Sequence, residues 1–300
     1  MYLNKAQVNK VQIPVYDISS IDRGARKNLM VQRFDSYLEQ HYEHLHRPHR
    51  HSFFHMVLFT AGSGSHTIDF QTYKVKTFQM YFMAPGQVHS WHFDNNIKGY
   101  VIHFEENLFT AFLAQPKYLE RFAFLNGTIE SAVCNLPEAA HNPMIRLFES
   151  LLQESVGDSE QNLDMIRIRL LEIFISVERY CGHMRLNPVA QHKSTLLRSF
   201  QDLIEKHYRD MRLPKQYADL LYITPNHLNA LCQDLLGKTA GDLIRDRILL
   251  ESKRLLTNAD MTITEIAYNL NFKDNSYFNR FFKKEVGSTP DEFRTSFLNS

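Results

Sequence analysis

The sequence predicts a multidomain α+β protein: an N-terminal antiparallel β-barrel followed by helices, and an all-α C-terminal domain with two helix-turn-helix units joined by a long helix. Three observations support this fold class. Short strand-like runs punctuated by glycine and proline occupy about residues 30–104, amphipathic helical repeats occupy about residues 105–182, and a helix-turn-helix pattern occurs at about 214–236 and again at about 262–284. At 300 residues, the chain is long enough for two hydrophobic cores.

The composition is that of a soluble globular protein, with 44% hydrophobic and 22% charged residues. No apolar run approaches the roughly 20 residues of a membrane span, so we expect a cytoplasmic protein without membrane contact. The net charge is only +1, so any nucleic-acid contact must depend on placed side chains as well as on bulk attraction to phosphate. Cys134, Cys181 and Cys232 are odd in number and form no C-x-x-C pair, so we interpret them as buried thiols.

The N-terminal strands are expected at residues 30–34, 53–61, 66–70, 80–83 and 100–104, with turns at 62–64 and 85–86. Several short strands with this punctuation are typical of an antiparallel barrel or a double-sheet roll. The segment 41–55 leads into the second strand and is rich in histidine.

Two segments resemble the small β-barrel called a cupin: PHRHSFFHMVLFTAGSG at 48–64 and APGQVHSW at 84–91. In metal-binding cupins, the first segment supplies H-x-H and a glutamate four residues on, and the second supplies one more histidine. His49 and His51 fit the pair, His55 stands where the glutamate would be, and His89 fits the second segment. Four imidazoles can hold Zn, Fe or Ni. Because the carboxylate that helps to hold a divalent ion is lost, we expect no metal and no other cofactor.

A small-molecule pocket is the more favoured interpretation of this barrel. Inward-facing strand positions should line it, since alternate residues of a strand face the interior. The candidates for effector binding are His49, His51, His55, His89 and Trp91, with Tyr81 and His103 as further candidates. Histidines and aromatic residues suit a sugar or another small polar metabolite. The alternative is that these side chains simply fill the barrel.

Helices are expected after residue 105, at 107–114, 117–125, 143–155 and 162–181. In the last of these, apolar residues repeat at spacings of three and four: Leu163, Ile166, Leu170, Ile173, Phe174 and Val177. Such a stripe packs either within the chain or against a second subunit. The segment 184–192 contains Asn-Pro and no apolar stripe, so we interpret it as a linker between an N-terminal domain at 1–183 and a C-terminal domain at 193–300.

The C-terminal domain contains the helix-turn-helix pattern twice. In the first unit, Pro214 opens a short helix and Thr224 is placed to cap a second helix at about 225–236. In the second, Thr262 and Glu265 form a capping box, and Asp274 is placed to cap the helix that follows. A long helix at about 239–257 joins the units. Its length of about 28 Å suits two recognition helices in adjacent major grooves, which are ~34 Å apart.

Residues 262–294 closely resemble the C-terminal signature of the AraC/XylS family of bacterial transcription regulators. They keep the I-A-x-x-x-x-F core at Ile266, Ala267 and Phe272, the run SYFNRFFKK at 276–284 and the close GSTPDEFR at 287–294. The resemblance implies binding to double-stranded DNA, a cupin-like sensing domain, dimerisation through the helical region and, in an activator, contact with RNA polymerase.

The second helix of each unit is then a recognition helix with a polar face toward DNA. The expected DNA-binding residues are Asn226, Asn229, Gln233, Lys273, Asn275, Ser276, Asn279, Arg280, Lys283 and Lys284. In the recognition helix of the first unit, Ala230 stands where arginine is frequent in the family, and Asp234 stands where lysine is frequent. We therefore expect the first helix to bind less tightly, or to read less sequence, than the second.

The sequence thus predicts a ligand-responsive transcription factor, with activation favoured over repression by family resemblance, that acts as a homodimer and is not an enzyme. Two alternatives remain open. One is a metal-dependent cupin enzyme, such as a dioxygenase or an isomerase, that carries a DNA-binding tail. The other is a regulator without a ligand that is controlled by its own abundance.

Overall fold

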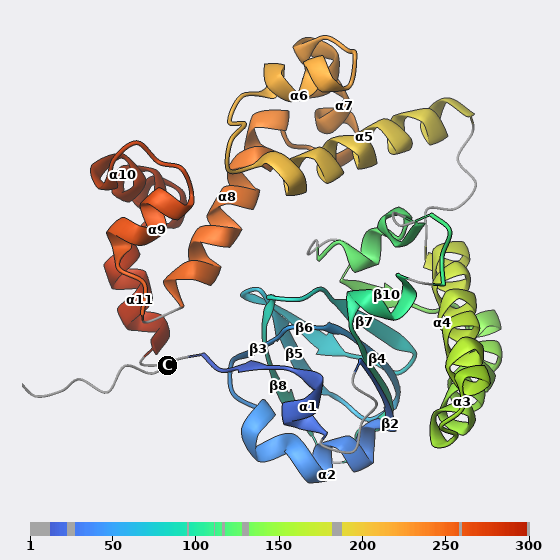
Figure 1. The fold of residues 1–300 in the computed structure, drawn as a ribbon. Helices are drawn as coiled ribbons and strands as arrows, with labels where there is room; N and C mark the ends of the chain where they lie inside the picture. Colours follow the sequence, from blue (N-terminus) through green and yellow to red (C-terminus); the bar gives the residue numbers. More distant parts are fainter. Residues whose placement is uncertain are drawn as a thin grey trace, which may run out of the picture. The chain divides into compact units, whose positions relative to one another are not determined.

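The computed structural model describes residues 13–22, 28–94, 96–110, 112–115, 118–127, 132–181, 188–257 and 260–298. The chain divides into two compact units, one made of Pro14–Leu186 and one that contains Asn187–Ser300 (Figure 1). None of the helices in the described ranges combines the length and the apolar character that crossing a bilayer requires.

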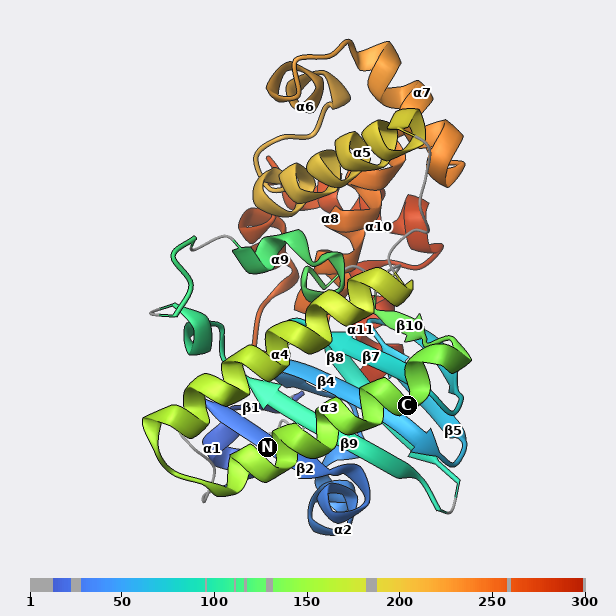
Figure 2. The same cartoon turned by 90° about the vertical axis from the view of Figure 1, so that its right-hand side faces the viewer.

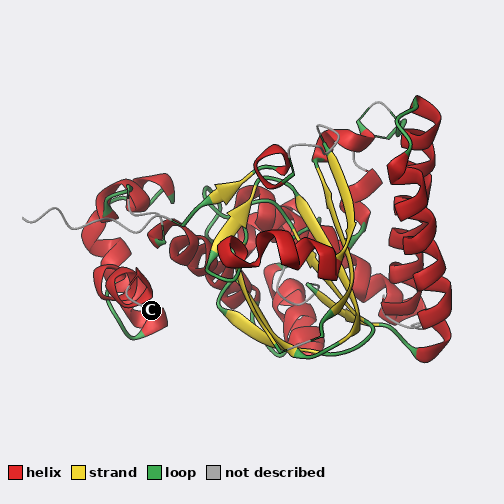
Figure 3. Ribbon diagram, turned by 90° about the horizontal axis from the view of Figure 1, so that it is seen from below, coloured by secondary structure: helices red, strands yellow, loops and turns green. Residues whose placement is uncertain are grey.

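The first unit is built on two five-stranded sheets that share an apolar core (Figures 1 and 3). One sheet has the order β1 (Val15–Tyr16), β3 (His49–His51), β8 (Val88–Phe93), β5 (Gly64–Ile68) and β6 (Gln71–Val75). The other has the order β10 (Val133–Asn135), β7 (Gln79–Met83), β4 (Phe54–Ala61), β9 (Lys98–Phe104) and β2 (Leu29–Arg33). All pairs are antiparallel except β1 with β3. The predicted cupin-like barrel is confirmed.

The second sheet is covered on both faces. Val57 and Val101 contribute to the core between the two sheets, whereas their neighbours Met56 and Ile102 pack against helices on the other face. Those helices are α3 (Glu138–Val156) and α4 (Glu160–Cys181), which lie side by side across the sheet (Figure 2). Burial of both faces explains why these strands read as continuous apolar runs instead of alternating ones.

The apolar stripe of α4 packs inside the chain. Ile166, Leu170 and Phe174 are fully buried in one cluster with residues of the second sheet and of α3. Of the two alternatives that the periodicity left open, the structure shows intramolecular packing. Ile168 lies off this stripe and is 45% exposed.

Several elements of this unit differ from the prediction. Helix α2 (Phe34–Leu45) was not predicted and covers one end of the barrel, near the short α1 (Ile18–Ile21) (Figure 1). Its core-facing repeat is short, because Phe34 and Tyr37 are followed by the polar His41. The predicted helices at 107–114 and 117–125 are 3-10 turns at Glu106–Phe109, Tyr118–Arg121 and Ala123–Leu125. Helix α3 begins before Pro143, whose missing N–H removes only one helical hydrogen bond.

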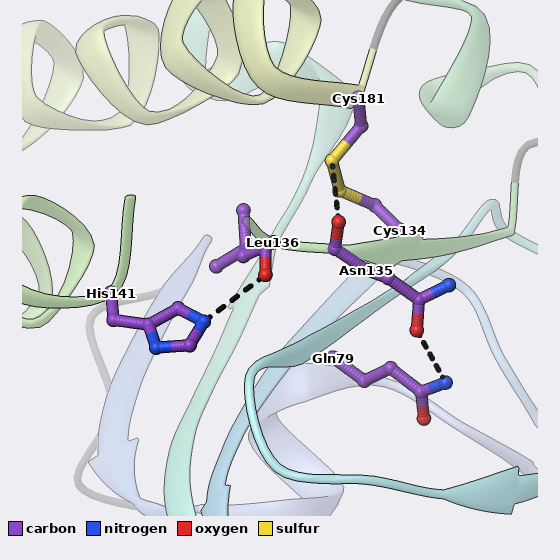
Figure 4. The surroundings of a disulfide bond; sticks show 6 residues. All are labelled: Gln79, Cys134, Asn135, Leu136, His141 and Cys181. Atoms are coloured by element: carbon purple, nitrogen blue, oxygen red, sulfur yellow. Dashed lines mark hydrogen bonds between the residues drawn. A yellow bond between two sulfur atoms is a disulfide. The ribbon is translucent and has the colours of Figure 1, made fainter. Parts of the chain in front are cut away.

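The prediction of three free thiols is wrong for two of them. A disulfide joins Cys134 on β10 to Cys181 at the end of α4, with 5.9 Å between their Cα atoms (Figure 4). Nearby, Gln79 donates a hydrogen bond to the Asn135 side chain at 2.9 Å. The two cysteines are 47 residues apart, so only the tertiary fold reveals their pairing. Cys232 is a buried free thiol, as predicted.

The second unit is all-α. Its helices are α5 (Pro188–His207), α6 (Pro214–Leu220), α7 (Pro225–Leu236), α8 (Ala240–Leu256), α9 (Ile263–Asn269), α10 (Asn275–Val286) and α11 (Pro290–Leu298). Helices α6 and α7 pack near the start of α8, and α9, α10 and α11 pack near its end (Figure 1). The unit has one apolar core, to which both helix pairs contribute.

The interpretation of 184–192 as a linker is partly wrong. Helix α5 already begins at Pro188, inside the segment interpreted as a linker. Proline at a first helical position leaves no extra amide unpaired, so Asn-Pro here is a helix start and not only a loop signal. Residues 184–187 lie outside the described residues.

Candidate DNA-binding surface and histidine cluster

Caps fix both helix pairs, and they are the caps that the sequence predicted. The Thr224 hydroxyl accepts a hydrogen bond from the third residue of α7 at 3.1 Å. Thr262 and Glu265 bond each other's backbone amides at 2.7 and 3.1 Å and so start α9. The Asp274 carboxylate accepts from the third residue of α10 at 2.6 Å. These bonds satisfy amides that a helix start leaves unpaired.

Helices α7 and α10 correspond position by position. Their caps are Thr224 and Asp274, so each residue of α7 matches the residue 50 places later in α10. The buried pair Leu228 and Phe278 faces the core of the unit. On the exposed side, the matched pairs are Asn226 with Ser276, Ala230 with Arg280, Gln233 with Lys283 and Asp234 with Lys284.

Seven of the ten predicted DNA-binding residues have exposed side chains. They are Asn226, Gln233, Lys273, Ser276, Arg280, Lys283 and Lys284. The face of α10 carries three of these cations, whereas on α7 the acidic Asp234 forms an ion pair with Lys193 at 2.6 Å. The structure therefore gives α10 the more cationic surface of the two helices.

The other three predicted residues are partly buried asparagines that bond within the unit. The side-chain oxygen of Asn229 accepts from the backbone N–H of Ala240 at 3.0 Å and so holds the start of α8. The Asn279 amide donates to the side-chain oxygen of Asn275 at 2.8 Å. Asn275 in turn donates to the hydroxyl of Thr264 in α9 at 3.3 Å. Residue type and spacing do not reveal these contacts, and the assignment of the three asparagines to DNA stays a prediction.

The exposed faces are wider than predicted. The aromatic run Tyr277, Phe278, Phe281 and Phe282 predicts one buried stripe on α10, but Tyr277 is 54% exposed, and Leu235 on α7 is 37% exposed. His227, which matches Tyr277 in position, is also exposed. The helical spacing counted from each cap places His227 and Tyr277 on the exposed face.

Helix α8 and one arginine set the distance between the helix pairs. The 17 residues of α8 span about 26 Å. Arg212, in the loop before α6, donates to the carbonyl of Leu270 and lies over the ring of Phe272, 4.6 Å from its centroid. Arg212 thus links the first helix pair, α6 and α7, to the turn between α9 and α10, in addition to the connection through α8.

The second candidate site is a cluster of six histidines inside the barrel: His49, His51, His55, His66, His89 and His103. Strand register brings them together. His49 pairs with His89 across β3 and β8, and His55 pairs with His103 across β4 and β9. His51 is two residues from His49 and therefore points to the same face. All six are at most 2% exposed.

All five predicted effector-binding residues belong to this site. Trp91 is 3% exposed, and its ring centroid lies 5.2 Å from that of His89 and 5.5 Å from that of His55. His66 was missed by the sequence interpretation. Its alternation along β5 with Ile68, opposite His89, was the signal for an inward position.

The cluster is neutral at physiological pH. Burial in the barrel lowers the pKa of every member, that of His49 to about 4 and that of His55 to about 3. Five ring nitrogens have no hydrogen-bond partner among the described residues: His49 Nε2, His51 Nδ1, His55 Nε2, His66 Nδ1 and His103 Nδ1. Each unpaired buried group costs about 1–3 kcal/mol, so apolar side chains would fill the barrel at lower cost.

Three members of the cluster lie close enough together to hold a metal ion. His49, His51 and His89 each offer a ring nitrogen, and these three atoms lie within 4.8 Å of one another. The fourth residue of the predicted set, His55, has its ring centroid 5.3 Å from those of both His51 and His89.

A hollow of about 610 Å³ lies elsewhere in the unit, between the start of β4 and the 3-10 turns. Its lining combines acidic Glu105, Glu106 and Glu120 with apolar residues such as Phe109 and Leu119. None of the predicted effector-binding residues lines it.

Two family models match the chain: a helix-turn-helix domain at 217–296 and an AraC-like ligand-binding domain at 35–166. The transcriptional activator RhaR of Yersinia pseudotuberculosis is 20% identical over 256 residues, which cover 84% of this chain and 86% of RhaR. The arabinose operon regulatory protein of Escherichia coli K12 is 27% identical over 160 residues, 53% of each chain. Among solved structures, ToxT of Vibrio cholerae is 15% identical with a TM-score of 0.43, covering 91% of this chain and 100% of ToxT.

Proposed function

This chain belongs to the AraC family of transcription regulators, and we propose that it is a ligand-responsive activator that works in the cytoplasm and is not an enzyme. The observation that carries the proposal is the pair of capped helix-turn-helix units, whose second helices expose polar faces at matching positions. Activation, which would require contact with RNA polymerase, is supported by the relative named as an activator.

The two recognition helices are proposed to enter adjacent major grooves on one side of the DNA. Helix α8 is about 26 Å long and the groove repeat is ~34 Å, so a modest splay of the helices or a bend in the DNA completes the fit. Arg280 is the best-placed residue for reading a base, because arginine can donate two hydrogen bonds to guanine. Lys273, Lys283 and Lys284 suit phosphates, and Asn226 and Ser276 suit base edges.

The effector is proposed to bind in the barrel at the histidine cluster, with Trp91 as a further contact. The expected ligand is small and polar, such as a sugar, because several imidazole ring nitrogens and the indole N–H there lack partners among the described residues. We further propose a homodimer. The main stripe of α4 is used within the chain, so the dimer contact must come from other positions, such as the exposed Ile168.

Substitution of Arg280 tests the DNA-binding proposal. Arg280→Ala should weaken binding to the specific site by about 1–3 kcal/mol, roughly 5- to 150-fold, if the guanidinium reads a base. Binding to random DNA should fall much less. Fluorescence anisotropy at fixed salt measures both affinities. Arg146→Ala is the matched control, because Arg146 is an exposed arginine on α3 of the other unit.

Equal losses on specific and random DNA would reassign Arg280 to a phosphate. Unchanged binding to both would contradict the assignment of α10 as a recognition helix. The enzyme alternative has its own test: turnover of a substrate that disappears in His89→Ala would contradict the proposal that the barrel only senses.

A further inference from the structure

The histidine cluster differs from an ordinary barrel core in the direction of its polar atoms. Nε2 of His51 and Nε2 of His89 share a hydrogen bond at 2.7 Å, in which the tautomers decide which ring donates, and a metal ion would replace that proton between them. Nε2 of His49 is buried without a partner among the described residues, and the His49 ring centroid lies 4.0 Å from that of His89. One ring nitrogen from each of these histidines therefore converges on one region of the barrel.

Two of these rings, those of His49 and His89, are oriented by hydrogen bonds at Nδ1, the nitrogen that does not face the proposed site. Nδ1 of His49 lies 2.7 Å from the backbone carbonyl oxygen of Arg47. Because a carbonyl only accepts, Nδ1 carries the proton and Nε2 presents its lone pair. Nδ1 of His89 is likewise engaged, by Nε2 of His66 at 3.0 Å. Outer partners of this kind fix ring orientation in protein metal sites.

We propose that His49, His51 and His89 bind a divalent transition-metal ion such as Zn²⁺, and that this ion, in place of a sugar or other organic metabolite, is the effector of the sensing domain. The second part of the proposal rests on the proposed function. Three imidazoles with an open fourth position form a known type of zinc site. In such a site, ligand nitrogens 2.0–2.1 Å from the ion are about 3.3 Å apart, which small ring rotations can reach from the present spacing.

The donor set also selects the class of ion. Nitrogen ligands suit Zn²⁺, Co²⁺, Ni²⁺ and Cu²⁺, whereas Ca²⁺ and Mg²⁺ need oxygen ligands that these rings do not supply. The sequence predicted no metal site, because His55 stands where metal-binding cupins have a carboxylate ligand. The structure places the three convergent nitrogens on His49, His51 and His89, so the site does not depend on a ligand at position 55.

The chain carries its own reporter for this site. Trp91 is the single tryptophan and lies against His89 and His55. Full-length protein, first treated with a chelator, should bind about one Zn²⁺ or Co²⁺ per chain. Its Trp91 emission should change up to that equivalence, and Co²⁺ should show the visible absorption of a nitrogen-ligated ion. His49→Gln and His89→Gln should weaken binding by roughly 100-fold or more.

His92→Gln is the matched control, because His92 lies on the same strand as His89 but on its exposed face. His66→Gln removes only the partner behind His89 and should weaken binding by roughly 10- to 100-fold. If a ligand variant does not fold, the Co²⁺ spectrum of the unsubstituted protein still decides the outcome. Absence of stoichiometric binding, or an equal loss in His92→Gln, would overturn the metal site.

DNA affinity tests the role of the ion as effector. Binding to the selected DNA site should change about tenfold or more when Zn²⁺ is added, and this change should vanish in His89→Gln. A bound ion that leaves DNA affinity unchanged would overturn the effector role. Protein that binds no specific DNA with or without metal would contradict the proposed function instead, while metal stoichiometry still tests the site.

Discussion

Tyr222 occupies the left-handed region of backbone space, with φ at 56°, in the turn between α6 and α7, and its side chain is 96% exposed. Asn271 has the same conformation, with φ at 57°, at the matching turn of the second helix-turn-helix, between α9 and α10. Asparagine tolerates this region better than tyrosine. Tyr222→Asn should therefore raise the free energy of unfolding of the DNA-binding unit by about 0.5–1 kcal/mol.

Urea unfolding followed by far-ultraviolet circular dichroism measures this change, and Trp91 fluorescence reports the sensing unit separately. The reciprocal variant Asn271→Tyr should lower stability by at least as much. A loss of stability in Tyr222→Asn would show that the aromatic ring makes a packing contact that its exposure hides.

The buried histidines predict acid lability of the metal-free protein. An unfolded histidine titrates near pH 6.5, whereas burial lowers the pKa of His49 to about 4 and that of His55 to about 3 in the folded state. The unfolded chain therefore binds more protons between these values. Stability should be full above about pH 6.5 and fall below it, by up to about 1.4 kcal/mol per pH unit for each such histidine.

Trp91 fluorescence of chelator-treated protein, followed during urea unfolding at pH 7.5, 6 and 5, checks this prediction. His49→Gln should reduce the steepness of the fall. If the urea midpoint at pH 5 equals those at pH 7.5 and pH 6, the cluster already carries charge in the folded state.

At the level of single residues, the caps were predictable because each depends on a spacing of three along the chain. Thr224, Thr262 and Asp274 all act as predicted. The asparagines were not. Asn229 stays a predicted DNA-binding residue, but its hydrogen bond with the amide of Ala240 in the next helix is a contact that only the tertiary structure reveals.

Among the helices, α8 is held to α5 by a nearly buried arginine. The Arg247 guanidinium bonds Glu205 at 2.8 Å and Glu251 at 3.0 Å and lies 4.1 Å from the ring centroid of Tyr208. Its pKa is raised by the two carboxylates, although burial acts in the opposite direction. Arg247→Ala should lower the free energy of unfolding of this unit by about 2–4 kcal/mol, because both carboxylates lose their main partner.

Arg247→Lys should recover only part of this loss, since lysine cannot bond two carboxylates and stack on the ring at once. Arg245→Ala is the control on the same helix, because Arg245 is 46% exposed and pairs only at the surface with Asp242. It should change stability by less than about 1 kcal/mol. Equal effects of Arg245→Ala and Arg247→Ala would contradict a specific tie between α8 and α5.

Elements with a long apolar repeat or a cap were predictable, and elements defined by tertiary partners were not. Helices α7 and α10 begin where their caps predict. Helix α2 was not predicted because His41 interrupts its apolar repeat. The early start of α5 was not predicted because Asn-Pro also marks loops. The stripe of α4 was seen, but periodicity does not say what a stripe packs against.

For the whole molecule, sequence patterns predicted the order of a cupin-like barrel, a helical layer and two helix-turn-helix units. They predicted five members of the six-histidine cluster, with His103 only as a further candidate, and missed His66. Only three of its members lie in one short segment, and strand register brings His66, His89 and His103 to the others. Local spacing carries no information about that register.

We propose that one chain binds DNA with two recognition helices, α7 and α10, held about one groove repeat apart by α8. Selection of bound sequences from a random DNA pool tests it most directly. Two enriched segments per chain are expected, centred about 10–10.5 base pairs apart. The segment bound by α10, which should lose its enrichment in Arg280→Ala, should be the more strongly enriched. A single enriched segment that depends on α10 alone, with no response to Asn226→Ala or Gln233→Ala, would contradict it.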